Sequence, residues 1–271
     1  MTMKSDRIRR SVATGGLLVG AVALSVIGTT TVTQASVELA GHGLRPIALA
    51  QPAPALMLNY TFTSETGTLV RDRSANGLNG HLVNTAAPTA YSSSLSGHGK
   101  ALQLVGANHQ FVDVGDAAPL DVNRYTLAAW VYYTGIPNDM TLDRWEVLEK
   151  AGAYWLNIRT DGRVRVGGFY GGCANPNWQY FDSPDPIPTN TWTHLASTYN
   201  GSQVALWVNG AKVATQAVTG TTCINAEPLA VGAKNAPAKG LLEAFFDGRL
   251  DDVRIYNKAI TSSQIAALAA R

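Results

Sequence analysis

The segment that most constrains the fold is the C-terminal stretch of residues 245–268. Between Leu250 and Tyr256, Val253 and Ile255 are separated by Arg254, which is the alternating pattern of a strand buried on one face. Thr261 then stands three residues before Gln264, the spacing of a capping box at the start of a short apolar helix. Such a strand needs a sheet to join, so the sequence predicts that this segment closes a β domain.

Composition supports an all-β domain. Apolar residues make up 46% of the chain and charged residues only 15%, and 26 Gly with 12 Pro indicate many turns. Short runs of β-branched and aromatic residues recur at intervals of roughly 8–12 residues and predict about twelve to fourteen strands. The sequence therefore predicts a two-sheet antiparallel sandwich with one short C-terminal helix.

Charge argues against a nucleic-acid partner. The formal net charge is +2, but the first ten residues alone contribute +3. The rest of the chain has 17 basic and 18 acidic residues, a net charge of −1. It therefore lacks the basic field that attracts nucleic acid or an anionic membrane.

The N-terminus has the pattern of a signal peptide. A basic segment is followed by the apolar run Val12–Ile27 and by the small-residue site Thr33–Ala35. A second cleavage motif ends at Ala50. An uncleaved anchor is the alternative, but a run of about sixteen residues is short for a span of ~20. We expect a signal peptide at 1–35, a linker at 36–54, a domain at 55–271 and secretion, with no membrane span after cleavage.

The chain holds two cysteines, Cys173 and Cys223. An even pair in an exported chain predicts a disulfide. A bond between them would close a fifty-residue loop and stabilise the fold by ~3–4 kcal/mol on the chain-entropy estimate. Zinc is not expected, because neither cysteine has a second ligand at zinc-site spacing.

Five segments carry a more specific pattern. In order they are the turn Asp-Arg-Ser-Ala-Asn-Gly-Leu-Asn-Gly (72–80), the run Gly-Lys-Ala-Leu (99–102), the strand Tyr-Thr-Leu-Ala-Ala-Trp-Val (125–131), the block Trp-Thr-His-Leu-Ala with Leu-Trp-Val-Asn-Gly (192–210), and the run Gly-Arg-Leu-Asp-Asp-Val-Arg-Ile-Tyr-Asn (248–257). Together they resemble the laminin-G-like jelly rolls of the concanavalin A-like lectin/glucanase superfamily. Ala75 departs from the family's Gly in the first segment. The resemblance covers about residues 56–268 and implies a jelly-roll sandwich, which we expect to be a monomer.

The resemblance also implies a place for a calcium ion. In this family the first turn and the last strand lie together, and several members hold calcium there. The matching residues are Asp72, Asn76, Asp251 and Asp252. Adjacent acids on a strand point to opposite faces unless a bulge turns them. The alternative is a metal-free hydrogen-bond network, or ion pairs with Arg71, Arg73 or Arg254.

Aromatic residues in the middle of the chain suggest a binding surface. Flat rings beside amide and charged groups offer a sugar both a stacking face and directional hydrogen bonds. We expect this surface on a loop at residues 170–182 and its neighbours; the candidates are Tyr170, Asn177, Trp178, Tyr180, Trp145, Trp155 and Arg165. The alternative is that the rings only pack the loop onto the sheet. Arg159, Arg163 and Arg165 form either a basic patch for acidic groups or an ordinary solvated strand face.

No catalytic motif stands out. Glucanases on this fold place acids as Glu-x-Asp-x-x-Glu along one strand face, and that run is absent. Glu146 and Glu149 are three residues apart, a spacing that does not align them on a regular strand. We expect a secreted, non-catalytic module that binds a carbohydrate or a cell-surface or matrix partner. The alternatives are a polysaccharide-cleaving enzyme, such as a lyase, that uses His194, Tyr154 and arginines of the sheet, or a structural envelope protein.

Overall fold

A computed structural model describes residues 53–84, 91–93, 99–135, 142–174 and 177–270. Residues Pro54–Arg271 form one compact unit. The predicted signal peptide and nearly all of the predicted linker lie outside the described residues. Within the described part of the chain, no helix is both long and apolar enough to cross a membrane.

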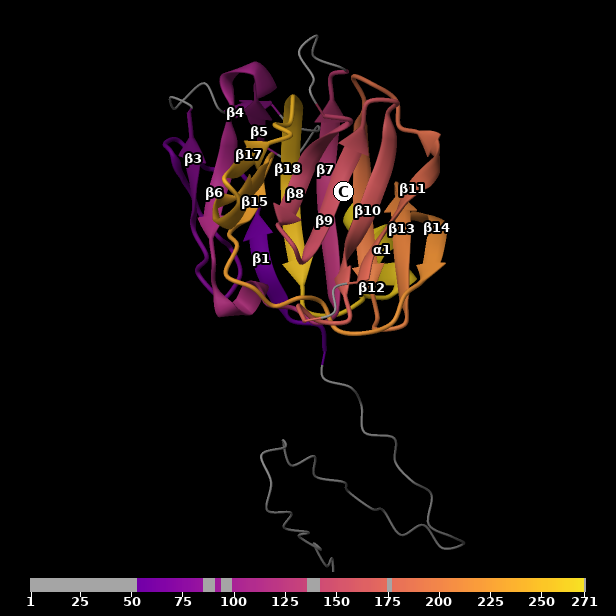
Figure 1. Cartoon of the computed structure of the whole chain (residues 1–271). Coiled ribbons are helices and arrows are strands. Elements are labelled where there is room, and N and C mark those ends of the chain that lie inside the picture. Colours follow the sequence, from indigo (N-terminus) through magenta and orange to yellow (C-terminus); the bar gives the residue numbers. More distant parts are fainter. Residues whose placement is uncertain (1–52, 85–90, 94–98, 136–141, 175–176, 271) are drawn as a thin grey trace, which may run out of the picture. The chain divides into compact units, whose positions relative to one another are not determined.

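The unit is built from two large antiparallel sheets (Figure 1). The first sheet has the order β14-β13-β12-β7-β18-β5-β4, and β1 also pairs with β18. Its strands are β1 (Leu56–Tyr60), β4 (Tyr91–Ser93), β5 (Lys100–Leu104), β7 (Tyr125–Tyr133), β12 (Trp192–Tyr199), β13 (Gln203–Val208), β14 (Ala211–Ala217) and β18 (Gly248–Tyr256).

The second sheet has the order β11-β10-β9-β8-β15-β6-β3-β2. Its strands are β2 (Leu69–Val70), β3 (Gly80–Val83), β6 (Phe111–Gly115), β8 (Arg144–Lys150), β9 (Tyr154–Arg159), β10 (Arg163–Tyr170), β11 (Asn177–Pro186) and β15 (Leu229–Val231). A separate hairpin joins β16 (Lys234–Ala236) to β17 (Leu241–Glu243), and short 3-10 turns occur at Gly106–Asn108 (η1), Ala118–Leu120 (η2) and Pro237–Lys239 (η3). The predicted all-β sandwich is confirmed.

The hydrophobic core lies between the two sheets. Leu127 of β7, Leu156 of β9 and Val166 of β10 are fully buried in one cluster there. Strand β7 is buried at eight of its nine positions and lies between β12 and β18, as a run that is apolar on both faces requires.

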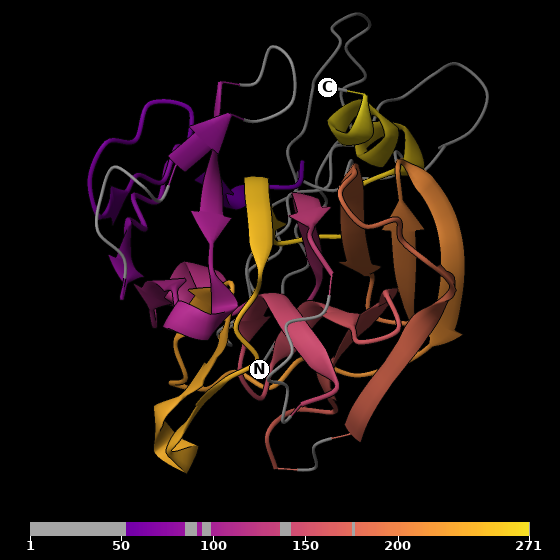
Figure 2. The same cartoon turned by 90° about the horizontal axis from the view of Figure 1, so that it is seen from above.

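The predicted C-terminal helix is α1, residues Ser262–Ala269, and it covers the outer face of the first sheet. Thr261 and Gln264 form the predicted capping box, with each side chain bonding the other residue's backbone N–H. Ile265 and Leu268 pack with Trp207 of β13. Seen from above, the yellow helix lies on one side of the unit and the pink strands of the second sheet on the other (Figure 2).

Two Asx-Gly pairs of the sequence form hairpin turns, and the predicted loop at 170–182 is wrong. Asp161 and Gly162 connect β9 to β10, and Asn209 and Gly210, both with positive φ, connect β13 to β14. Much of the expected loop is instead strand β11. Its prolines are tolerated because β11 is an edge strand, where a missing N–H breaks no ladder.

Candidate functional site

The first turn and the last strand do lie together, as the resemblance implied. Strand β1 pairs with β18, and Asn59 links the two features, because its backbone N–H donates to Asp72 and its side chain accepts from Arg254. Asp72 also accepts from the backbone N–H groups of Ser74 and Leu78 and from the Ser74 hydroxyl, so all four lone-pair sites of its carboxylate are filled. This turn is the hydrogen-bond network that the sequence offered as the alternative to calcium.

The two acids of β18 are turned by a bulge. Asp252 has a positive φ of 49°, and the pairing with β7 shifts between Asp251 and Arg254. Arg254 donates to Asp252 at 2.8 Å, and the Asp252 backbone N–H donates to Asp251.

Asn76 faces carbonyl groups rather than carboxylates, since its amide donates to the backbone oxygens of Leu56 and Met57. Arg71 and Arg73 both pair with buried Glu65 instead of the aspartates. Among the described residues, no group of three or more His, Cys, Asp or Glu could hold a metal ion. The arrangement therefore does not fit a site in which all four predicted side chains hold calcium, and a melting experiment with a chelator tests whether the ion binds.

A groove of about 480 Å³ lies on the outer face of the second sheet. Its floor and one wall come from β8, β9, β10 and β11, which lie side by side in Figure 1. Its other boundary comes from the turn at Ala151 and Gly152 and from the β16–β17 hairpin. Because side chains alternate along a strand, the residues between the core positions of these strands point into the groove.

Four aromatic rings form one wall of the groove: Trp155, Phe169, Trp178 and Tyr180. The Phe169 and Trp178 rings are nearly parallel at 8°, with centroids 6.1 Å apart, and Trp155 meets both edge-on. Trp178 is 59% exposed, so one large ring is open to a ligand.

Gly167 lets the rings approach the sheet. A Cβ atom at this position would lie 2.5 Å from the Trp155 ring and 2.7 Å from the Tyr180 Cβ. Its φ is not positive, so the glycine is needed for space and not for an unusual backbone conformation.

The arginines of this face are paired with acids. Arg165 donates to Asp182 at 2.7 Å and lies over the Tyr180 ring, 4.5 Å from its centroid. Arg159 donates to the same carboxylate at 2.7 Å. Partial burial acts to raise the pKa of Asp182, but the bonds from the two arginines outweigh it and lower the pKa. Arg159 and Arg165 therefore brace the aromatic wall and do not form an unpaired basic patch.

The floor contains Glu146 and Glu149, whose spacing in the sequence did not predict a shared face. A bulge between Glu146 and Leu148 turns both Val147 and Leu148 into the core, so Glu146 and Glu149 share the outer face. The sequence carries a signal for this bulge, because two adjacent apolar residues stand between the two acids. Glu146 accepts from Arg144 at 2.7 Å and from Asn157 at 3.3 Å.

Burial makes the two glutamates weaker acids than usual. Burial raises the pKa of Glu149 well above the usual glutamate value, and the negative charge of Glu146 raises it further. Burial also raises the pKa of Glu146, although Arg144 opposes this. Carboxyl groups with raised pKa values that lie together in a groove are candidates for a functional site.

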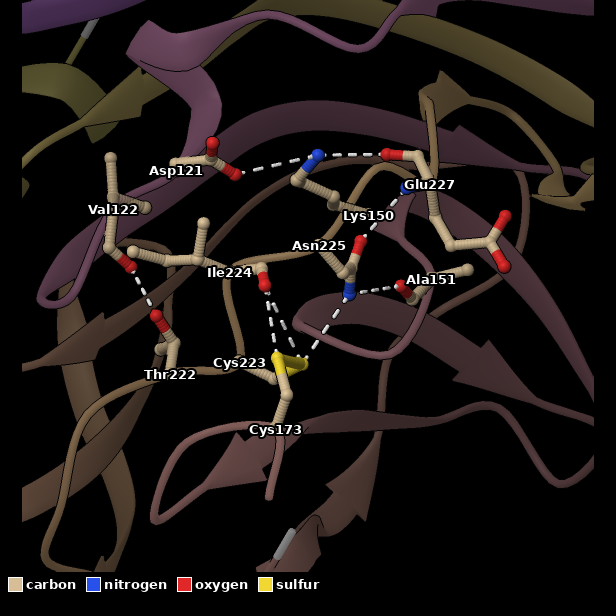
Figure 3. The surroundings of a disulfide bond; sticks show 10 residues. All are labelled: Asp121, Val122, Lys150, Ala151, Cys173, Thr222, Cys223, Ile224, Asn225 and Glu227. Atoms are coloured by element: carbon tan, nitrogen blue, oxygen red, sulfur yellow. Dashed lines mark hydrogen bonds and ion pairs between the residues drawn. A yellow bond between two sulfur atoms is a disulfide. The ribbon is translucent and has the colours of Figure 1, made fainter. Parts of the chain in front are cut away.

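The predicted disulfide is present and supports the rim of the groove. Cys173 and Cys223 are bonded, with Cα atoms 4.5 Å apart, and join the β10–β11 connection to the segment before β15. Figure 3 shows Asn225 beside the bond, donating to the Ala151 carbonyl at 3.0 Å. Ala151 lies in the turn that bounds the groove, so the disulfide and Asn225 hold this turn in place.

The predicted ligand-binding residues divide into two groups. Trp155, Trp178, Tyr180 and Arg165 line the groove. Trp145 and Tyr170 do not: they are 2% and 0% exposed in the core between the sheets. Their predicted binding role is corrected to packing, because both occupy inward positions of their strands. Asn177 alternates with Trp178 and accepts a hydrogen bond from Gln179, so it lies off the groove wall.

The residues of the alternative enzyme do not meet. His194 is buried in the first sheet, with its ring 5.4 Å from that of Trp130, and burial lowers its pKa to about 4, helped by the charge of Arg254. Tyr154 belongs to the second sheet and points into the core, where its hydroxyl donates to Leu120. These two side chains therefore cannot act on one substrate.

Residues 106–266 match a family model described as the concanavalin A-like lectin/glucanases superfamily. No curated protein matches the chain. Among solved structures, the chain is similar to domain 4 of AbnA, an extracellular GH43 arabinanase from Geobacillus stearothermophilus, in complex with arabinotriose. The TM-score is 0.57 and the sequence identity is 22%, and the alignment covers 80% of this chain and 98% of the arabinanase domain.

Two toxin domains have similar structures. The binding domain of Paraclostridial Mosquitocidal Protein 1 gives a TM-score of 0.58 at 16% identity, covering 79% of this chain and 52% of that one. The binding domain of botulinum neurotoxin DC in complex with SialylT gives a TM-score of 0.53 at 12% identity, and the alignment covers 80% of this chain and 51% of that one. At these identities the comparisons show a shared fold and nothing more specific.

Proposed function

The chain belongs to the concanavalin A-like lectin/glucanase superfamily, and on that premise we propose that its domain is a secreted, non-catalytic module that binds a carbohydrate in the groove. The signal-peptide pattern at the N-terminus supports work outside the cell. The single observation that carries the proposal is an exposed aromatic wall facing a polar floor in one groove.

Sugar chemistry requires this combination. A pyranose or furanose ring has an apolar face of C–H groups and an edge of hydroxyl groups, so its site needs a flat ring and directional polar partners. Trp178 and Phe169 supply parallel rings on one side. Glu146, Glu149 and Asn157 supply oxygen atoms on the floor. That domain 4 of AbnA is in complex with arabinotriose supports a saccharide ligand on this fold.

The removal of one indole tests the proposal. Screening a glycan array with the mature domain identifies a binder, and we expect Trp178→Ala to weaken that binding by about 10- to 30-fold, as loss of a central aromatic anchor does. Trp192→Ala is the matched control, because its ring is partly exposed on the first sheet, against Tyr132. Equal affinity of both variants, or a domain that binds no glycan, contradicts the proposal.

One observation favours a second function, cleavage of a polysaccharide. Glu146 and Glu149 are paired carboxyl groups in the groove, the residue type that glycoside hydrolysis uses. The same binding mixtures are therefore assayed for new reducing ends. Retained binding without product supports the binding module, and product that disappears in Glu149→Gln would make the domain an enzyme.

A further inference from the structure

The floor of the groove holds three buried oxygen atoms that accept no hydrogen bond from an N–H group or a hydroxyl group of the protein, although Glu146 and Glu149 lie close enough to bond each other when one of them is protonated. They are Glu146 Oε2, Glu149 Oε2 and Asn157 Oδ1, on residues that are 1%, 6% and 1% exposed. Buried acceptors are nearly always satisfied in folded proteins. All three residues line the groove, so a molecule that enters it can supply the missing donors.

The charges around the groove are balanced. Its lining includes four acids (Asp143, Glu146, Glu149, Glu243) and four bases (Arg144, Arg165, Lys234, Lys239). Three of the four bases already contact a carboxylate: Arg144 pairs with Glu146, Arg165 with Asp182 and Lys234 with Glu243. The lining therefore gives no net attraction to a ligand of either sign.

An acidic ligand meets a further obstacle. Its carboxylate or sulfate would bring negative charge to a floor that already holds two carboxyl groups, and like charges in a buried site are costly. A cationic ligand would approach Lys234 and Arg144, which lie close enough to affect the pKa of Glu149. An uncharged ligand that is rich in hydrogen-bond donors avoids both conflicts.

We infer that Glu146, Glu149 and Asn157 form a subsite for the hydroxyl groups of an uncharged sugar residue, and that this subsite rejects acidic sugars. The inference rests on the proposed carbohydrate-binding function and names the class of saccharide that the groove takes. The aromatic wall provides affinity for a sugar ring, and the floor favours an uncharged sugar over a charged one.

Three kinds of trisaccharide test the selection. Arabinotriose, cellotriose and mannotriose are neutral, trigalacturonic acid is acidic and the glucosamine trimer is basic. Binding of each sugar to the folded domain is measured by ligand-observed NMR at millimolar sugar concentration. We expect at least one neutral sugar to bind and the acidic and basic sugars to bind about tenfold more weakly or not at all, in line with the loss of one hydrogen bond to a charged group.

Two variants at Glu149 test the floor itself. Glu149→Leu removes both carboxyl oxygens and leaves a shorter apolar side chain, and we expect about tenfold weaker binding of the neutral sugar. Glu149→Gln keeps one oxygen acceptor and the shape, so we expect its affinity to stay within about threefold. Both variants are melted first to confirm that they fold.

The outcomes separate this inference from the proposed function. If the acidic or the basic trisaccharide binds most tightly, or if Glu149→Leu binds the neutral sugar as well as the parent, the domain still binds carbohydrate but the neutral-sugar subsite is refuted. If no saccharide of any charge binds, the proposed function itself fails.

Discussion

A single added methyl group at Gly167 tests how closely the aromatic wall lies on the sheet. In Gly167→Ala the new Cβ would lie 2.5 Å from the Trp155 ring, 2.6 Å from the Gln179 carbonyl oxygen and 2.7 Å from the Tyr180 Cβ. The carbonyl belongs to the backbone of β11, so a side-chain rotation alone cannot make room. Strand β11 must therefore shift, and the Trp155 ring must move as well.

The expected cost follows from the crowding. Overpacking of this kind costs ~1–3 kcal/mol. Replacing Gly by Ala recovers ~0.4–1 kcal/mol by restricting the unfolded chain. A net loss of ~1–2 kcal/mol lowers the melting midpoint of a domain of this size by roughly 2–8 °C. Binding of a neutral trisaccharide is also expected to weaken, because the displaced rings no longer form the wall.

Gly67→Ala is the matched control. A Cβ at Gly67 would meet no atom within 4 Å, and its φ is also not positive. We expect its midpoint to be unchanged or slightly raised. Thermal melting followed by circular dichroism, with sugar titration of both variants, gives the comparison. If Gly167→Ala melts and binds like Gly67→Ala, the close packing of Trp155 and Tyr180 over this strand is refuted.

Three further predictions concern titration and metal. The folded-state pKa of His194 is about 4 and its unfolded value is near 6.5, so between these pH values the unfolded chain binds one more proton than the folded domain. The free energy of unfolding is therefore expected to fall by up to about 3 kcal/mol as pH drops from 6.5 to 4. Urea titrations at several pH values should show a smaller fall in His194→Gln. Glu149 has a raised folded-state pKa, so the stability that its neutral form provides is lost as pH rises. Glu149→Gln should therefore have a higher melting midpoint than the parent at alkaline pH and the same midpoint at acid pH. A difference in midpoint that does not change with pH would contradict this. Since protein groups fill the lone pairs of Asp72, adding a chelator should leave the melting midpoint unchanged, and a midpoint that rises with calcium would instead establish the ion.

The elements that the sequence predicted well depend on short-range chemistry. The capping box at Thr261 needs only residues three apart, and the short helix that follows it needs only a local apolar stripe. The placement of Tyr170 was also within reach, because it shares the parity of the inward Val164 and Val166 along one strand.

The floor of the groove depends on features that local patterns describe poorly. A bulge shifts the parity of β8 at Val147, so the spacing of Glu146 and Glu149 gives the wrong face if the strand is read as regular. Strand β11 contains prolines that argue against a strand until its edge position is known. Lys234 and Glu243 reach the groove from a hairpin far along the chain, and no local signal connects that hairpin to the sheet.

The indole N–H signals of the six tryptophans give the most direct test of the groove as the binding site. The nitrogen-15-labelled domain is titrated with a neutral saccharide that binds to it, and the indole signals are followed in a two-dimensional proton–nitrogen spectrum. We predict that the signals of Trp155 and Trp178 shift while those of Trp130, Trp192 and Trp207, all on the first sheet, stay in place. Shifts at the tryptophans of the first sheet, with Trp178 unmoved, would contradict the account.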